Sequence, residues 1–140
     1  MFKISRGLGA VVCAVAMGFL LSSAAPALSA AAEAGAMDPE TALNYMLATE
    51  DLVIVDTREM RYIDKSFVGA LNIPWNEMAE RYREIPTDRP VLLHCGLGWV
   101  APKAYAVLHQ KVPALKLHYI DGAPRFDEYN HARSDLGKGL

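Results

Sequence analysis

The chain has 140 residues, 52% of them hydrophobic and 21% charged, which suits one ordinary domain with its own core. Its 14 basic and 16 acidic residues give a net charge of −2. This balance argues against a nucleic-acid or anionic-membrane partner, so neither is expected.

Residues 1–30 have the pattern of a secretory signal peptide. Lys3 and Arg6 precede the uncharged apolar stretch 7–21, and a tract of small residues follows it. The apolar stretch is short for a membrane span, which needs about 20 residues. We predict cleavage within residues 29–32 and export, with the bacterial periplasm as the destination and no membrane attachment afterwards. An uncleaved N-terminal anchor is the alternative.

Cleavage would leave Cys95 as the single cysteine, because Cys13 lies within the apolar stretch. Taking Lys3 and Arg6 from the 14 basic residues leaves 12 against 16 acidic ones, a net charge of −4. A lone thiol in an oxidising compartment is buried and inert, paired between chains, or reactive.

The mature chain opens with a predicted flexible leader, residues 31–37, followed by a helix. Asp38 suits the capping position, Pro39 the first helical position and Glu40 the first turn. Apolar residues at helical spacing extend this helix to about Ala48. Residues 52–55 are apolar and rich in β-branched side chains, which predicts a strand buried on both faces.

Strands and helices alternate along the rest of the domain. A weaker strand is predicted at residues 68–73, helical turns at 77–83, a strand at 91–94, a helix at 101–110 and a strand at 115–120. The domain is expected to span residues 38–130, with a polar tail at 131–140. This alternation predicts an α/β fold with a central, mainly parallel sheet of about five strands and helices on both faces.

Cys95 directly follows the predicted strand 91–94, and ligands of parallel sheets bind beyond the carboxyl ends of strands. Gly96 and Gly98 allow the backbone to curl, so that amides and the next helix N-terminus hold a thiolate, a persulfide or an oxyanion. The alternative is an inert buried cysteine that ends a core strand. The sequence has no metal-ligand spacing and no dinucleotide fingerprint, so no metal or cofactor is expected.

Four segments, in order and spacing, resemble rhodanese domains: residues 54–59, 69–74, 91–98 and 119–122. The resemblance implies a single rhodanese-like domain. It also implies transfer of sulfane sulfur from a small donor, thiosulfate or a persulfide, to a thiol acceptor through a persulfide on Cys95. The sulfur-binding loop would comprise Gly96, Leu97, Gly98, Trp99 and Val100.

The loop departs from the usual rhodanese pattern Cys-x-x-Gly-x-Arg. Val100 occupies the arginine position and Ala101 that of a small hydroxyl residue. Arginine would hold anionic thiosulfate by charge-assisted hydrogen bonds. The alternative function is therefore a non-catalytic or weakly catalytic module that binds sulfur or docks an unidentified protein partner. A related periplasmic group has a Cys-x-x-Cys-Trp loop, but Gly98 replaces its second cysteine, which excludes dithiol chemistry within the loop. Related phosphatases carry an arginine six residues after the cysteine, and Ala101 at that position excludes phosphatase chemistry.

Asp56 and Arg58 follow the strand 52–55, where a structural ion pair or a supporting role beneath the site is expected. His94 alternates with Cys95 along its strand, so its side chain should point to the opposite face of the sheet. A hydrogen-bonded, semi-buried histidine is therefore expected rather than a general base.

Two further cations lie near the predicted loop. Lys103 is expected either to supply some of the positive charge missing at Val100 or to be a solvated helix residue. Arg125 follows the Gly122 turn, from which its side chain could reach the mouth of the pocket. Trp75 and Tyr62 are predicted to pack in or near the core.

Overall fold

The computed structural model describes residues 35–138, and the predicted signal peptide lies outside this range. A five-stranded parallel sheet forms the centre of the domain, in the order β1-β5-β4-β2-β3. The strands are β1 Ala36–Met37, β2 Val53–Asp56, β3 Leu71–Asn72, β4 Val91–His94 and β5 Leu117–Ile120. The predicted sheet of about five parallel strands is confirmed.

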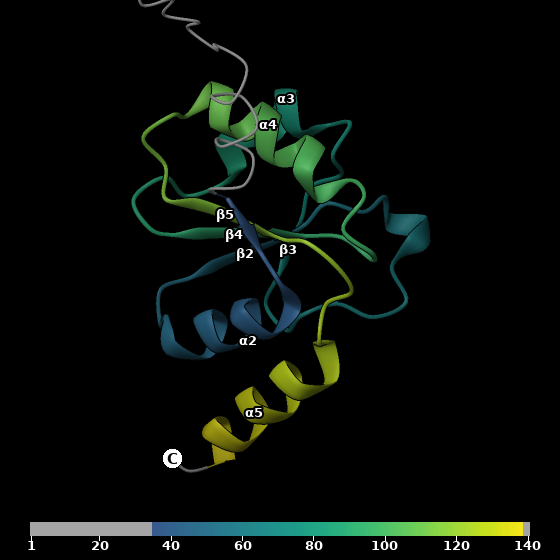
Figure 1. Ribbon diagram of the computed structural model, residues 1–140, viewed down its shortest axis with the longest axis vertical. Coiled ribbons are helices and arrows are strands. Elements are labelled where there is room, and N and C mark those ends of the chain that lie inside the picture. The colour runs from purple at the N-terminus through teal and green to yellow at the C-terminus, as the bar shows by residue number, and fades with distance from the viewer. Residues whose placement is uncertain (1–34, 139–140) are drawn as a thin grey trace, which may run out of the picture.

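Helices cover both faces of this sheet, as expected. Helices α3 and α4 lie on one face, and α2 and α5 lie on the other (Figure 1). Their bounds are α2 Pro39–Ala48, α3 Met78–Arg81, α4 Ala101–Lys111 and α5 Phe126–Lys138, with 3₁₀ turns at Met60–Tyr62 and Tyr82–Glu84. No helix within residues 35–138 has both the length and the apolar character that a membrane crossing requires.

Helix α2 begins as the sequence predicts. The Asp38 carboxylate accepts hydrogen bonds from the backbone N–H groups of Glu40 at 3.0 Å and Thr41 at 3.1 Å. Pro39 occupies the first turn, where its missing N–H costs no hydrogen bond.

Two segments differ from their predicted state. Residues 36 and 37, expected in a flexible leader, form strand β1, because the amides of Tyr119 and Asp121 donate to Gly35 and Met37 carbonyls at 2.7 and 2.8 Å. Residues 131–138, expected in a polar tail, continue helix α5, which the buried side chain of Tyr129 anchors to the domain.

The predicted strand at residues 68–73 is reduced to Leu71–Asn72. Gly69 has a φ of +80°, and the side chain of Val68 is 58% exposed, so the chain turns here instead of pairing. The other strand and helix boundaries lie within two residues of those predicted.

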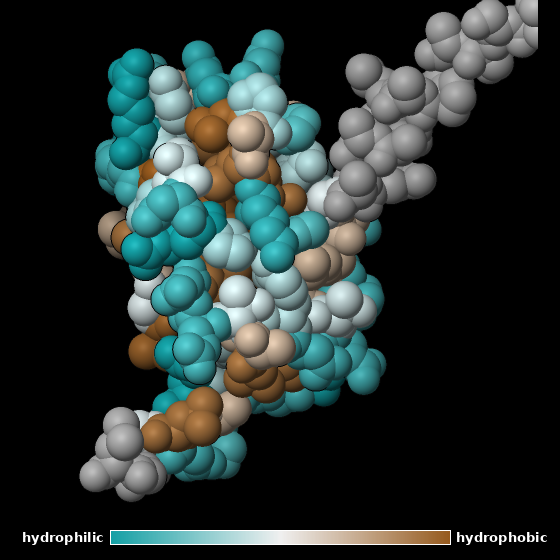
Figure 2. Space-filling view, turned by 90° about the vertical axis from the view of Figure 1, so that its left-hand side faces the viewer, coloured by the Kyte–Doolittle hydropathy of each residue, from teal (hydrophilic) through white to brown (hydrophobic). Residues whose placement is uncertain are grey.

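The core has two layers because successive strand residues face opposite sides of the sheet. Val55 and Leu93 pack beneath α4, whereas Ile54 and Leu92 pack against α2. All strands are parallel, so their carboxyl ends meet at one edge of the sheet. Figure 2 shows the opposite edge, where apolar side chains form patches among hydrophilic ones.

Candidate sulfur-handling site

Cys95 lies at the carboxyl end of β4, in the central part of the sheet. Its side chain is 2% exposed, and its sulfur accepts a hydrogen bond from the backbone N–H of Gly98 at 3.1 Å. Gly98 adopts a φ of +85°, which turns the chain back and directs this amide at the sulfur. A sulfur anion at this position would have a hydrogen-bond donor already in place.

A pocket of about 460 Å³ adjoins Cys95. Four loop residues predicted to bind sulfur line it, while Gly98 contacts the sulfur from within the loop. The pocket is lined by Arg58, Tyr62, Cys95, Gly96, Leu97, Trp99 and Val100. The structure therefore brings the predicted loop and Arg58 to one cavity.

Asp56 and Arg58 form the expected ion pair at the end of β2. The Arg58 guanidinium donates through Nε at 3.0 Å and through its terminal nitrogen at 2.6 Å to the two Asp56 oxygens. It also donates to the backbone carbonyl of Lys65 at 2.5 Å. Asp56 is 1% exposed and Arg58 9%, so the pair is largely removed from solvent.

The electrostatics of this pair favour both charged forms. Burial alone would raise the pKa of the Asp56 carboxyl, but hydrogen bonds from Arg58 and Ser66, together with the nearby His94 ring, hold it below its usual value. The hydrogen bonds to Asp56 raise the pKa of Arg58. Arg58 supports the pocket as a cation whose charge is already compensated.

Two residues that the sequence analysis did not single out complete this support. The Ser66 hydroxyl donates to Asp56 at 2.8 Å, and the Asn72 side-chain amide donates to the carbonyls of Asp56 and Arg58 at 3.0 and 2.9 Å. No sequence motif marks Ser66, because its position depends on the path of the loop between β2 and β3.

His94 points away from Cys95, as the strand alternation predicts. Its ring is fully buried against the rings of Phe67 and Phe126, at centroid distances of 4.8 and 5.4 Å. Burial is the largest effect on it and lowers the pKa of His94 to about 4, against the opposing attraction of Asp56. His94 is therefore neutral at pH 7 and lies outside the sulfur pocket.

We expect the protein to lose stability as the pH falls from about 6.5 towards 4. The pKa of His94 is lower in the folded state than in the unfolded state, so the unfolded chain binds the extra proton. A shift from 6.5 to about 4 corresponds to about 3 kcal/mol of unfolding free energy. Urea unfolding at stepped pH measures this slope.

The matched variants for that measurement are His94→Gln and His109→Gln. His94→Gln should flatten the dependence between pH 6.5 and 4, whereas the exposed His109→Gln should retain it. An unchanged slope in His94→Gln would show that the buried ring is not its source.

Neither of the two additional cations lines the sulfur pocket. The Lys103 ammonium lies 4.9 Å from the centroid of the Trp75 ring, and Arg125 pairs with Glu128 at 2.6 Å. Trp75 is partly buried against the core, as predicted. Tyr62 is 62% exposed and lines the pocket, so the prediction that it packs in or near the core is wrong. The 3₁₀ turn at Met60–Tyr62 carries it outwards.

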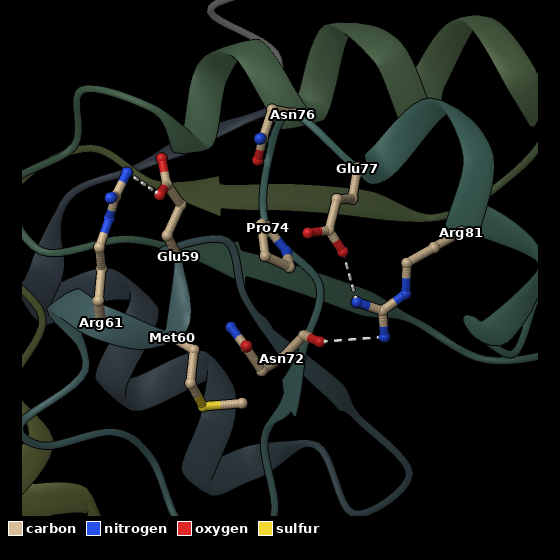
Figure 3. Close-up of a pocket in the computed structure, with 8 residues that line it drawn as sticks. All are labelled: Glu59, Met60, Arg61, Asn72, Pro74, Asn76, Glu77 and Arg81. Carbon is tan, nitrogen blue, oxygen red and sulfur yellow. Dashed lines mark hydrogen bonds and ion pairs between the residues drawn. The ribbon is translucent and has the colours of Figure 1, made fainter.

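A second pocket, of about 440 Å³, lies beside β3 and is polar. Its charged side chains pair with one another: Arg61 contacts Glu59 at 2.5 Å, and Arg81 contacts Glu77 at 2.8 Å (Figure 3). Cys95 does not line it. In the part of the chain that the structure describes, no group of three or more metal-ligating side chains occurs.

Known proteins resemble this chain in sequence. The model of the rhodanese-like domain matches residues 39–124. A sulfurtransferase from Allochromatium vinosum is 33% identical over 76 residues, which cover 54% of this chain and 71% of that protein.

Two solved structures share the fold. A rhodanese-related protein from Thermoplasma volcanium matches with a TM-score of 0.54 and 20% identity, covering 75% of this chain and 93% of that one. A rhodanese homologue from Thermus thermophilus matches with a TM-score of 0.51 and 25% identity, covering 63% and 94%. The chain belongs to the rhodanese-like domain family, a family of the sulfurtransferase type.

Proposed function

We propose that this protein is a sulfurtransferase that forms a persulfide on Cys95 and passes the outer sulfur to a thiol acceptor. One observation carries the proposal. The Cys95 sulfur lies at the carboxyl end of β4, accepts an N–H from Gly98 and borders a pocket large enough for a small donor.

The chemistry needs two displacements. The Cys95 thiolate attacks the sulfane sulfur of the donor, the donor's S–S bond breaks, and its remainder leaves with the electron pair, as sulfite when the donor is thiosulfate. The acceptor thiolate then attacks the outer sulfur and forms a new S–S bond, and Cys95 leaves as a thiolate. No external oxidant or reductant is consumed.

A second candidate function is a sulfur-binding or partner-docking module with little turnover. Val100 at the usual arginine position favours it, because the loop after Cys95 offers no cation there to hold an anionic donor, and the Arg58 that lines the pocket is paired with Asp56. This alternative keeps the persulfide on Cys95 but slows its transfer.

Intact mass spectrometry of the purified protein tests the proposal. Incubation with thiosulfate, and separately with a persulfide donor, should add about 32 Da, one sulfur atom, to the protein but not to Cys95→Ser. Absence of the adduct with both donors would contradict the sulfurtransferase and the sulfur-binding form of the second candidate, and would leave only partner docking. An adduct that is not released to cyanide or a thiol would favour the binding module.

Val100→Arg should raise the rate of loading from thiosulfate about 10-fold or more. A charge-assisted hydrogen bond contributes about 1.5–3 kcal/mol, and 1.36 kcal/mol corresponds to tenfold in rate. Intact mass spectrometry of samples quenched at successive times gives the loading rate. The control is Val68→Arg, which adds the same charge at a side chain that is 58% exposed and does not line the pocket. Equal rates in both variants would show that charge at position 100 is not limiting.

We further propose that the protein acts after export, in the periplasm. The basic start and apolar stretch of residues 1–21 support this. Osmotic-shock fractionation of cells expressing the full chain with a C-terminal tag should release a shortened form. A full-length form confined to the cytosolic fraction would contradict export.

A further inference from the structure

Among the residues that the structure describes, Arg58 is the one charged residue that lines the sulfur pocket, and Asp56 pairs with it. Both Asp56 oxygens accept from its guanidinium, and Asp64 lies 3.7 Å from its remaining terminal nitrogen. A buried ion pair of this kind presents little net field to a ligand, because the opposite charges cancel within a few ångströms.

The rest of the pocket wall is apolar and unusually exposed. The side chains of Tyr62, Leu97 and Trp99 are 62%, 59% and 76% exposed, and all three line the pocket beside Cys95, which is 2% exposed. Large apolar side chains in one exposed group mark a binding site more often than isolated ones do. The sulfur therefore lies at the base of an apolar cavity with an aromatic rim.

The size of the cavity indicates a small molecule as the occupant. About 460 Å³ lies within the usual range of about 300–1,000 Å³ for small-molecule sites. A thiosulfate ion would leave most of this volume and the aromatic rim unused. A sulfane donor with an aromatic or branched aliphatic body would cover the rim and displace water from it.

We propose that the Cys95 site is specific for sulfane-sulfur donors with an apolar organic body, such as organic thiosulfonates or persulfides, and that Trp99, Leu97 and Tyr62 determine this specificity. The inference rests on the proposed function, since it names the donor for the same persulfide. With an organic thiosulfonate, the Cys95 thiolate takes the sulfane sulfur, and the sulfinate leaves with the electron pair of the broken S–S bond.

Two thiosulfonates of equal charge provide the test. Benzenethiosulfonate and methanethiosulfonate both bear one negative charge and release a sulfinate. They differ in the organic group on the sulfonyl sulfur, which is phenyl in one and methyl in the other. Loading rates of Cys95, followed by intact mass, are divided by the rates of the same donors with free cysteine. The normalised preference for the benzene compound should be about 10-fold or more, the discrimination that an apolar pocket commonly achieves. Thiosulfate should load more slowly than either.

The rim variant Trp99→Ala should reduce this preference several-fold. The control Leu136→Ala also removes an exposed apolar side chain, 63% exposed on α5, and should leave the preference unchanged. Far-ultraviolet circular dichroism and urea midpoints confirm that both variants are folded.

The outcomes separate this inference from the proposed function. Loading from all donors without preference, or with a preference for thiosulfate, overturns the specificity and leaves persulfide formation intact. A preference that survives in Trp99→Ala overturns the role of the rim. Failure of every donor to load the wild type, while free cysteine reacts, overturns the proposed function itself.

Discussion

Gly98→Ala should destabilise the protein by about 3 kcal/mol or more and slow persulfide formation. Gly98 has a φ of +85°, which L side chains rarely adopt, and a Cβ there would lie 2.6 Å from the backbone nitrogen of Gly122. The loop would have to move away from the turn after β5 to relieve this close contact. The same movement would take the Gly98 N–H away from the Cys95 sulfur.

Gly69→Ala is the matched control for Gly98→Ala. Gly69 has a similar φ of +80°, but a Cβ there would meet nothing within 4 Å. Gly69→Ala should therefore lower the unfolding free energy only by the backbone strain, about 1–2 kcal/mol, and should leave the loading rate of Cys95 unchanged. Urea unfolding and loading rates of both variants provide the measurement. Equal losses of stability would show that the contact with Gly122 is not significant.

Asp56→Asn should lower the free energy of unfolding by about 3 kcal/mol at pH 7. The substitution preserves volume but leaves the Arg58 guanidinium, 9% exposed, without its compensating charge. Removing one partner of a buried ion pair costs about 3–5 kcal/mol. It also removes a carboxylate acceptor from Ser66, whose hydroxyl donates at 2.8 Å.

An exposed ion pair provides the comparison for Asp56→Asn. Glu84 contacts Arg81 at 2.7 Å, and its side chain is 52% exposed. Glu84→Gln should cost much less unfolding free energy than Asp56→Asn, because solvent screens such pairs. In the double variant Asp56→Asn/Arg58→Met, part of the stability should return, since no unpaired charge remains. Full additivity of the two substitutions would contradict direct coupling.

The parallel sheet and the position of Cys95 were predictable because they depend on local patterns. The apolar runs that form β2 and β4 are continuous in sequence. The three adjacent residues Asp38-Pro39-Glu40 are enough to mark the start of α2. The alternation of side chains along a strand likewise places His94 and Cys95 on opposite faces.

The features that were missed depend on contacts between distant segments. Ala36 and Met37 have no strong strand propensity, and they form β1 because the backbone amides of Tyr119 and Asp121 donate to the carbonyls of Gly35 and Met37. Tyr62 looks like a core residue by composition, but the turn that contains it faces the pocket. The Ser66 contact with Asp56 spans ten residues of irregular loop, whose path no local pattern specifies.

The sheet described for residues 35–138 ends on both sides in strands of only two residues, β1 and β3. A strand this short presents few unpaired backbone groups to a neighbouring molecule, which limits the addition of foreign strands and aggregation. A protein shortened to begin at Pro39, where the family match starts, would lose β1 and uncover the backbone of Tyr119 and Asp121 on β5 and just beyond it. We therefore expect the short N-terminal strand to limit pairing of β5 with other molecules, while the apolar rim beside the sulfur remains exposed.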